Sequence, residues 1–215
     1  MVPKEYYGRL FTKEQLPVNY HPEALTLESM IKVDKQLRCK RCYSQIEEDW
    51  QLPEGQYYCR ACIVFGRNQE GKELYYFPSK TSEIEFPVLK WLGELTPYQA
   101  EVSEKLLETY QKQKDSLVHA VTGAGKTEMI YKIVAYVLGN KGRVAIASPR
   151  VDVCRELFLR MQRDFTCSIS LLHAESEPYD GSPLVIATTH QLLKFYQIFD
   201  LVIVDEVDAY PFVGN

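Results

Sequence analysis

The chain has 215 residues, 46% of them hydrophobic and 25% charged, with a formal net charge of −4 at pH 7. The length suits one full domain with a smaller module, and the composition is that of an ordinary soluble globular protein. The weak negative charge excludes a general attraction to nucleic acid, so any such binding must come from local basic clusters. No apolar run approaches the roughly 20 residues of a membrane helix, so we expect a cytoplasmic protein without membrane insertion.

Residues 1–37 form an amino-terminal segment rich in tyrosine, lysine and glutamate, in which we find no catalytic or binding motif. Tyr6, Tyr7, Phe11 and Tyr20 carry rings that either stack on bases or pack against the neighbouring module. Packing is the more common use of such rings, so we predict a structural role for them. The role of the segment as a whole stays open.

Residues 38–80 contain four of the six cysteines, as two Cys-x2-Cys pairs with sixteen residues between them. The short turn in each pair lets both thiolates face one ion, and two pairs complete a tetrahedron. The predicted ligands are Cys39, Cys42, Cys59 and Cys62. Four soft thiolates favour zinc, with iron as the alternative. Four protein ligands leave no open position, so we predict one structural Zn²⁺ per chain. Cys154 and Cys167 are predicted to be free thiols.

Basic and aromatic residues are interleaved around these cysteines, and acids lie in the loop between the two pairs. The basic residues are Arg38, Lys40, Arg41, Arg60 and Arg67, and the aromatic ones are Tyr43, Trp50, Tyr57, Tyr58 and Phe65. Such a pattern is typical of surfaces that contact phosphates and stack bases. A purely structural or protein-docking module remains the alternative.

A hairpin strand is predicted at residues 74–77, and a helix begins after Thr96, which stands as the N-cap before Pro97. The helix continues through residue 110. Gln99, in its first turn, is a candidate to recognise an adenine base, with Trp91 or Tyr98 packing on that base. An ordinary surface glutamine is the alternative.

The stretch Ala120–Thr127 has the sequence AVTGAGKT and lies between an apolar run at 117–121 and a helical pattern at 129–138. This arrangement predicts a strand, a tight glycine turn and a helix start, which is how a Walker A loop presents backbone N–H groups to nucleotide phosphates. The predicted ATP-binding residues of the loop are Gly123, Ala124, Gly125, Lys126, Thr127 and Glu128. Lys126 is predicted to neutralise the β- and γ-phosphates, and Thr127 to ligate Mg²⁺. Ala120 departs from the glycine of the strict motif.

Two further strand ends carry polar residues. A buried strand at 142–147 is followed by Ser148-Pro149-Arg150 and a helix, and a second strand at 184–187 leads to Thr188 and Thr189. Ligands bind at the carboxyl edge of parallel sheets, so Arg150 is a candidate for contact with a nucleic-acid phosphate. Helix capping is the default use of all three residues. Another short strand is predicted near 168–172.

Residues 201–204 form a four-residue apolar strand that we expect to be buried, and it delivers Asp205 and Glu206 to its end. Asp205 is predicted to hold Mg²⁺, and Glu206 to polarise the water that attacks the γ-phosphate. The acid pair follows Lys126 by 79 residues, and the two motifs together are more specific than either alone.

The Walker A variant, Ser148-Pro149-Arg150, Thr188-Thr189-His190 and the box Asp205-Glu206-Val207-Asp208 resemble the first RecA-like domain of a DEAD/DEAH-type superfamily-2 helicase. With a four-cysteine module before the motor, residues 38–213 resemble the ComFA family of late-competence DNA-uptake ATPases. PriA helicases have similar motor motifs, but their cysteines lie within the second motor domain.

The resemblance implies an α/β fold: a RecA-like P-loop domain at 81–215, with a parallel sheet flanked by helices, preceded by the zinc module. It implies an ATP-driven motor on single-stranded DNA that works with competence proteins and a membrane channel, in the cytoplasm or at the inner face of the membrane. Arg150, Thr188 and Thr189 would then contact DNA. The second RecA-like domain, with its transition-state arginine, does not follow the acid pair, so we expect ATP–Mg²⁺ and DNA binding with poor hydrolysis.

Three other functions are compatible with these motifs: a PriA-like replication or repair helicase, a zinc-stabilised docking protein with a nucleotide switch, and a P-loop kinase or metabolic ATPase. Adjacent Asp205 and Glu206 disfavour the kinase. The sequence allows oligomerisation, and it leaves open the direction of travel, the preference for DNA or RNA, and the partners of the zinc module.

Overall fold

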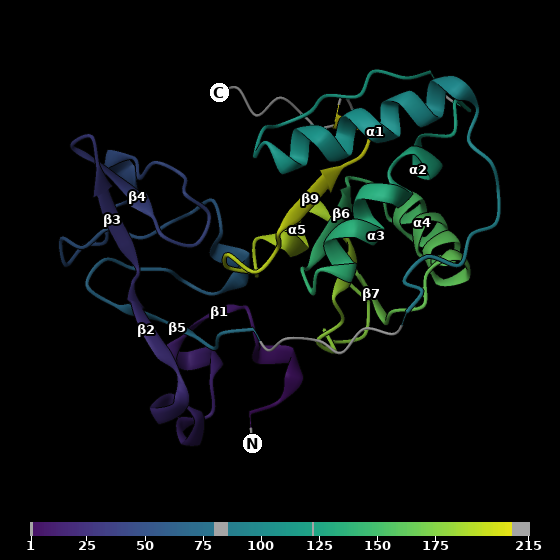
Figure 1. Ribbon diagram of the computed structural model, residues 1–215. Coiled ribbons are helices and arrows are strands. Elements are labelled where there is room, and N and C mark those ends of the chain that lie inside the picture. Colours follow the sequence, from purple (N-terminus) through teal and green to yellow (C-terminus); the bar gives the residue numbers. More distant parts are fainter. Residues whose placement is uncertain (1, 80–85, 122, 208–215) are drawn as a thin grey trace. The chain divides into compact units, whose positions relative to one another are not determined.

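The computed structural model describes residues 2–79, 86–121 and 123–207, and the chain divides into two compact units (Figure 1). Unit 1 comprises Met1–Lys80 and Thr189–Ile198, and unit 2 comprises Thr81–Thr188 and Phe199–Asn215. The predicted domain boundaries at 37 and 80 stay predictions. None of the described helices combines the length and the apolarity that crossing a membrane requires.

Unit 1 contains a three-stranded antiparallel sheet in the order β1-β5-β2. Its strands are β1 (Leu10–Thr12), β2 (Leu25–Glu28) and β5 (Glu73–Tyr76), and β5 contains most of the strand predicted at 74–77. Unit 1 also contains short 3-10 turns, one before β1 and the others between its strands: η1 (Lys4–Tyr6), η2 (Lys13–Gln15), η3 (Val18–Glu23), η4 (Glu48–Trp50) and η5 (Ile63–Phe65). Tyr6 packs edge-on against Phe11 and Tyr20, with ring centroids 5.1 and 5.6 Å away. Tyr6 and Tyr7 also contact Phe77, with ring centroids 6.0 and 6.4 Å away, so these rings pack against residues 38–80 as predicted.

A separate hairpin of β3 (Met30–Val33) and β4 (Gln36–Cys39) leads into the first cysteine pair. Met30 pairs with Cys39 across the hairpin, and both side chains are buried in one small cluster with the other cysteines. The hairpin therefore starts before the first cysteine pair and fixes one end of it.

Residues 189–198, which begin with α5 (Thr189–Leu192), belong to unit 1 although they lie between two strands of unit 2 in the sequence. The amide of Leu10 donates to the carbonyl of Lys194 at 3.1 Å, and the amide of Tyr196 donates to the carbonyl of Gly8 at 2.8 Å. Gly8 has φ +73°, and a Cβ there would lie 2.5 Å from the Cγ2 atom of Ile198. Only glycine allows this approach.

Unit 2 is built on a parallel four-stranded sheet in the order β7-β8-β6-β9, as expected for a RecA-like domain. The strands are β6 (Val144–Ser148), β7 (Ile169–Leu172), β8 (Leu184–Thr188) and β9 (Leu201–Val204). The helices are α1 (Pro97–Gln111), α2 (Lys126–Met129), α3 (Tyr131–Gly139) and α4 (Val151–Asp164). Helix α4 packs on β6, β7 and β8, and α3 packs on β6 and α1 (Figure 1).

The local sequence explains where these elements begin and what they bury. Thr96 caps α1 as predicted, because its hydroxyl accepts the amide of Gln99, with Pro97 at the first helical position. Val134 from α3, Met161 from α4 and Ile146 from β6 are each at most 1% exposed and share one core cluster. Helix-spaced apolar residues thus cover a continuous apolar strand.

Two predictions for the sheet of unit 2 are wrong. Residues 117–121 form no strand, and Leu117 and Val121 are 83% and 75% exposed. Strand β9 is not fully buried, since Val202 and Val204 are 49% and 46% exposed. Both results have one cause: β9 lies at the end of the strand order, and the apolar run at 117–121 makes no ladder with it. Apolar composition favours a strand, but a strand forms only where its backbone is paired.

A buried hydrogen bond in the core of unit 2 offers a test of this packing. The Tyr131 hydroxyl donates to Asp164 Oδ2 at 2.6 Å, and both residues are less than 5% exposed. Arg163 first, and then Tyr131, hold the pKa of Asp164 below its usual range. Tyr131→Phe should therefore lower the free energy of unfolding by about 1–2 kcal/mol at pH 7.

Urea unfolding measures this loss, followed by Trp91 fluorescence in a Trp50→Phe background. The loss should shrink as the pH falls through the folded-state pKa of Asp164, because a lowered pKa stabilises only while the carboxyl is ionised. Tyr98→Phe, at a residue 62% exposed, is the control and should change stability by less than about 0.5 kcal/mol. Equal losses in the two variants would contradict the assignment.

Candidate functional site

The glycine turn before α2 has the backbone that a phosphate-binding loop needs. Gly123 and Gly125 have φ angles of +82° and +75°, a region that favours glycine, and α2 begins at Lys126. The predicted turn and helix start are thus confirmed, although the strand before them is absent. Thr127 is half-buried and Lys126 is exposed. Thr122 lies outside the described residues.

Gln99 holds this turn against α1. Its Nε2 donates to the carbonyl of Ala124 at 2.8 Å, and its Oε1 accepts the amide of Thr96 at 2.8 Å. A Cβ at Gly125 would lie 2.4 Å from the same Nε2 atom, so the turn and the glutamine are closely packed. Both ends of the Gln99 amide are therefore engaged within the chain, and adenine recognition by Gln99 stays a prediction.

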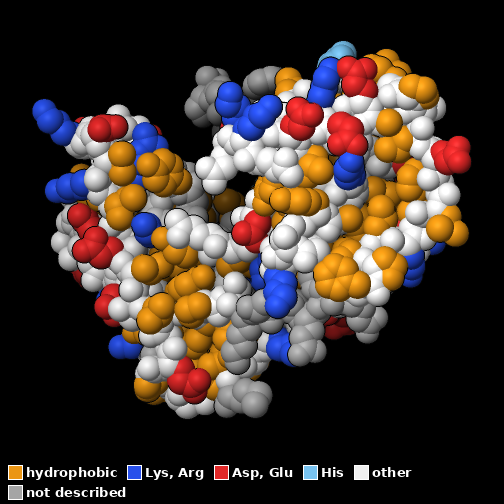
Figure 2. All heavy atoms as spheres, viewed as in Figure 1, with side chains coloured by type: hydrophobic (Ala, Val, Ile, Leu, Met, Phe, Trp, Pro, Cys, Tyr) orange, Lys and Arg blue, Asp and Glu red, His pale blue; other side chains and the backbone are white. Residues whose placement is uncertain are grey.

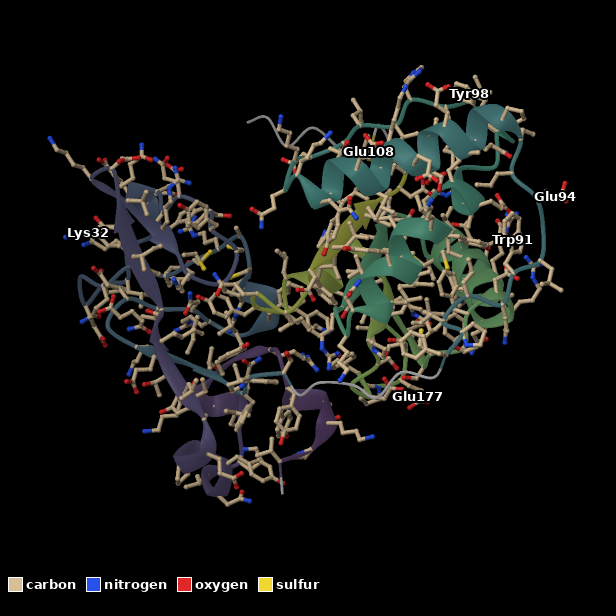
Figure 3. All side chains as sticks on the ribbon, viewed as in Figure 1. Lys32, Trp91, Glu94, Tyr98, Glu108 and Glu177 are labelled. Atoms are coloured by element: carbon tan, nitrogen blue, oxygen red, sulfur yellow. The ribbon has the colours of Figure 1, made fainter. Side chains whose placement is uncertain are left out.

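The two aromatic candidates for adenine packing lie in different surroundings (Figure 3). Trp91 packs edge-on against Tyr131, with ring centroids 5.5 Å apart. Tyr98 lies at the start of α1 and is 62% exposed. Trp91 is thus part of the core packing, whereas the ring of Tyr98 is open to solvent.

Glu128, also predicted to bind the nucleotide, faces an arginine instead. Its Oε1 atom lies 3.4 Å from Arg160 Nη1 on α4, and Arg160 also contacts Glu156 at 2.8 Å. The pair joins the first turn of α2 to α4. Its clearest role in this structure is to tie the helix that follows the glycine turn to the rest of unit 2.

The acid pair follows β9 directly. The amide of Asp205 donates to the carbonyl of Ala147 at 2.8 Å, which extends the pairing of β9 with β6 by one residue. Asp205 Oδ1 accepts the amide of Glu206 at 2.9 Å. Glu206 has φ +51°, so its backbone is in the left-handed region that non-glycine residues seldom adopt. Asp208 lies outside the described residues.

One cavity of about 1470 Å³ joins the two motifs. Lys126 and Thr127 line it from α2, and Asp205 and Glu206 line it from the end of β9. It is also lined by Leu117–Ala120 and by Leu201–Val204, which lie in the two segments that the sequence predicted to be strands. Residues far apart in the sequence therefore share one space, and its lining includes Lys126, Thr127, Arg150 and the two acids that follow β9.

The three residues predicted to contact nucleic acid lie where strands end. The register pairs Ser148 of β6 with Thr188 of β8, and Arg150 follows two residues later as the N-cap of α4. Ser148 and Thr188 are thus neighbours at the carboxyl edge of the sheet, the same edge at which β9 delivers Asp205. Thr189 begins α5 and belongs to unit 1.

Arg150 is already bound to acids. Its Nε and Nη2 atoms donate to Asp152 Oδ1 and Oδ2 at 3.2 and 2.5 Å, and its Nη1 lies 3.9 Å from Glu206 Oε1. Asp152 first, and then Glu206, raise the pKa of Arg150. The guanidinium is therefore a cation shared by two carboxylates at the sheet edge.

The four predicted zinc ligands converge in unit 1. The Cys39 and Cys62 sulfurs are 3.7 Å apart, those of Cys42 and Cys59 are 3.5 Å apart, and all four lie within 4.8 Å of one another. Zn–S bonds of about 2.3 Å in a tetrahedron place sulfurs about 3.8 Å apart. The observed spacing thus fits a tetrahedral zinc ion.

The surroundings of the sulfurs also fit a bound cation. Hydrogen bonds from Cys39, Cys59 and Cys62 lower the pKa of Cys42, whereas those involving Cys39, Cys42 and Cys59 raise the pKa of Cys62. The four groups therefore do not all become thiolates unless a positive ion neutralises them. Asn68, which is 1% exposed, donates to Cys39 Sγ at 3.1 Å and to the Ser29 carbonyl at 2.7 Å. It orients one ligand, as outer residues of metal sites do.

The basic residues around the cysteines differ in their burial and in the partners that they contact within the chain. Arg41 is 6% exposed and donates to the Gly66 carbonyl at 2.8 Å, so it supports the second cysteine pair from inside. Arg60 pairs with Asp49 at 3.0 Å. Arg38 lies over Tyr43, and Arg67 over Tyr58, at 5.2 and 5.8 Å from the ring centroids. On the face drawn in Figure 2, the coloured basic and acidic side chains are interspersed.

Comparison with known proteins decides the family. The family model described as ResIII, type III restriction enzyme, res subunit, matches residues 92–210, which is more than half of the chain. The chain belongs to the ResIII family. This helicase-family match covers the glycine turn, the strand-end residues and the acid pair. It accounts for the fold of unit 2 and leaves the cysteine cluster outside.

Two relatives of this ResIII protein cover both units. The chain is 57% identical over 214 residues to the competence protein ComFA of Streptococcus pneumoniae, which is 98% of this chain and 49% of that protein. It is 35% identical over 213 residues to the competence protein ComFA of Bacillus subtilis, which is 95% of this chain and 46% of that protein. The predicted resemblance to ComFA is confirmed. The chain spans about half the length of these relatives.

Sequence reasoning missed three features of the ResIII protein's site. The ion pair between Arg150 and Glu206 joins residues 56 apart in the sequence, and no periodicity connects them. Arg160, which engages Glu128, is one of several charged residues on α4. Asn68 follows the last cysteine by six residues, and only the fold shows that its amide meets Cys39. Each depends on tertiary contact, so no local signal identified it.

Cys59→Ser should remove the metal, because a hydroxyl is a poor replacement for a thiolate at a four-sulfur site. We expect about one zinc per chain in the unaltered protein and a small fraction of that in the variant, measured by elemental analysis after exhaustive dialysis. Cys167→Ser is the matched control, since its sulfur lies outside the cluster, and it should keep the metal. Full zinc content in Cys59→Ser would remove Cys59 from the ligand set.

Proposed function

We propose that this chain is the ATP-binding part of a motor that moves along single-stranded DNA and assists the uptake of transforming DNA. One observation carries the proposal: Lys126, Thr127, Asp205 and Glu206 line a single cavity. Phosphate binding requires the first pair, and Mg²⁺ binding with activation of water requires the second. Membership in a helicase family and similarity to two proteins named for competence support the choice of motor and process.

The nucleotide site is assigned as follows. Gly123–Thr127 would surround the phosphates with backbone N–H groups, and Lys126 would supply a positive charge. Thr127 and Asp205 offer a hydroxyl and a carboxylate, which are the hard oxygen donors that Mg²⁺ prefers. Bound Mg²⁺ would neutralise charge on the phosphates during transfer to water. Glu206 would orient that water and draw its proton.

The DNA strand is assigned to Arg150 and Thr188 at the carboxyl edge of the sheet of unit 2, with Thr189, the next residue in the sequence, as a further proposed contact. An arginine and two hydroxyls are typical donors to the oxygens of a nucleic-acid backbone. Because Asp205 ends at the same edge, a strand bound there would lie near the nucleotide site. We infer that this nearness is how DNA binding affects ATP turnover.

The cysteine cluster is assigned to one structural Zn²⁺, which would hold the β3–β4 hairpin against the second cysteine pair. Arg38 and Arg67, each over a tyrosine ring, offer charge and aromatic surface to DNA or to a partner protein. The partners we propose are other proteins of the DNA-uptake system, including its membrane channel. The place of action is the cytoplasm or the inner face of the membrane.

The surface formed by Arg38 and Arg67 over their tyrosine rings also favours a second function. In it, the chain is a zinc-stabilised DNA-binding or docking protein, and the nucleotide acts only as a switch. The two functions differ in turnover, because a motor hydrolyses ATP repeatedly on DNA whereas a switch gains little from it. A PriA-like role in replication or repair would share the motor chemistry and differ in partners.

The deciding experiment measures phosphate release by the 215-residue chain with single-stranded DNA, duplex DNA and RNA at one stated salt concentration. We expect slow turnover that single-stranded DNA stimulates most. Lys126→Ala should lower the stimulated rate by roughly 10- to 100-fold at limiting ATP, because it removes a charge-assisted contact to phosphate.

Lys105→Ala is the control for a lost positive charge, since Lys105 is an exposed residue of α1 paired with Glu101. It should behave as the unaltered chain does. No stimulation by any nucleic acid would reject the motor and favour the switch. An unchanged rate in Lys126→Ala would reject the phosphate assignment. Turnover as fast as that of a two-domain helicase would refute the expected slow hydrolysis.

A further inference from the structure

Arg150 lies between two carboxylates of different origin. Asp152, in the first turn of α4, takes two of its nitrogens, and the third, Nη1, is directed at Glu206 Oε1 at 3.9 Å. Glu206 follows β9 and is the acid assigned to water activation. The residue assigned to DNA phosphate is thus paired with the residue assigned to the chemistry.

The geometry of this contact is set on both sides. Arg150 is the N-cap of α4 with extended backbone angles, and Asp152 is anchored at the amino terminus of that helix, where a negative charge is favoured. The two bonds to Asp152 fix the plane of the guanidinium, so Nη1 has a defined direction. On the other side, the backbone of Glu206 is in the left-handed region, and its amide donates to Asp205 Oδ1 at 2.9 Å.

Glu206 is held by little else. Its Oε2 atom is buried and accepts no hydrogen bond from the described residues, and its side chain is 31% exposed. The side chain of Arg150, by contrast, is 57% exposed and can be reached from solvent. A phosphate that approaches the sheet edge therefore meets Arg150 before it meets the acid.

We propose, resting on the function proposed above, that Arg150 is a positioning residue that holds Glu206 while no DNA is bound and releases it to the attacking water when a DNA phosphate takes the guanidinium. A carboxylate that faces a guanidinium polarises a water less strongly, because part of its negative potential is neutralised. DNA at the sheet edge would thereby increase the activity of the acid at the nucleotide site. The coupling passes through one side chain.

The proposal can be tested by measuring DNA affinity alone, without measuring ATP turnover, because the two contacts of Arg150 are thermodynamically linked. If Glu206 and DNA phosphate compete for Arg150, removal of the Glu206 charge must tighten DNA binding, and only while Arg150 is present. An exposed ion pair of this length is weak, so the expected change is about two- to fivefold. If removal of the Glu206 charge tightened DNA binding only by lowering the negative charge near the DNA, the tightening would also occur in a protein that lacks Arg150.

The test is a double-mutant cycle on the affinity for a fluorescent single-stranded oligonucleotide at one fixed salt concentration. The four proteins are the unaltered chain, Glu206→Gln, Arg150→Gln and the double variant. Glu206→Gln should bind DNA about two- to fivefold more tightly in the Arg150 background and equally tightly in the Arg150→Gln background. Glu156→Gln, a loss of the same charge on α4 at a residue paired with Arg160, is the control and should have the same small effect in both backgrounds.

A second measurement identifies the phosphate. Affinity for a fluorescent ATP analogue should change less than twofold in Arg150→Gln, because the proposal assigns this arginine to DNA. If Arg150→Gln weakens the analogue more than the oligonucleotide, the nucleotide is the competitor and the proposal is overturned.

The remaining outcomes separate this proposal from the function on which it rests. Equal effects of Glu206→Gln in both backgrounds would overturn the coupling and leave the motor intact. Failure of the unaltered chain to bind single-stranded DNA would overturn both, and the ATP-analogue titration would then show whether the nucleotide assignment survives. Thermal unfolding of each variant confirms that these partly exposed substitutions leave the fold unchanged.

Discussion

The register of three parallel strands is the constraint on which the site depends. Ser148 on β6 pairs with Thr188 on β8, and the amide of Asp205 continues the pairing of β9 with β6 through the Ala147 carbonyl. These backbone hydrogen bonds bring Ser148, Thr188 and the acid pair to the same carboxyl edge of the sheet. A shift of one strand by one residue would move its side chains to the opposite face. Register therefore determines whether the polar residues meet at all.

Unit 1 has a different source of order. Its hydrophobic clusters are small, and three of the four cysteines, Cys39, Cys59 and Cys62, make up the buried part of one of them with Met30 and Ile46. A metal at such a cluster contributes folding free energy that a small core cannot supply. Residues 189–198 belong to unit 1, but in the sequence they lie between β8 and β9 of unit 2. The chain therefore connects this segment of unit 1 directly to both of those strands. Loss of the metal would thus be expected to disturb the segment that begins with Thr189.

Local signals predicted the elements that local chemistry determines. The Thr96 cap, the glycine turn, the paired cysteines and the strand end before Asp205 were placed correctly, and β6 ends one residue later than predicted, at Ser148. Capping, turns and short ligand spacings depend on neighbours in sequence. The strand at 117–121 was predicted from apolar composition and is absent, because pairing with an edge is a tertiary event. The exposure of Val202 and Val204 follows from the same missing partner. The contacts of Arg150, Glu128 and Asn68 join distant residues, so composition and periodicity contained no information on them.

The central claim is that the lysine-bearing turn and the acid pair serve one metal-bound triphosphate. A crystal structure of the chain with Mn²⁺ and a non-hydrolysable ATP analogue tests it most directly, because the anomalous signal of manganese locates the ion independently of the refined atoms. The account predicts one manganese between Thr127 Oγ1 and the Asp205 carboxylate, with the γ-phosphate beside Lys126. Manganese bound elsewhere, or a triphosphate that contacts neither Lys126 nor the Asp205 site, would contradict it.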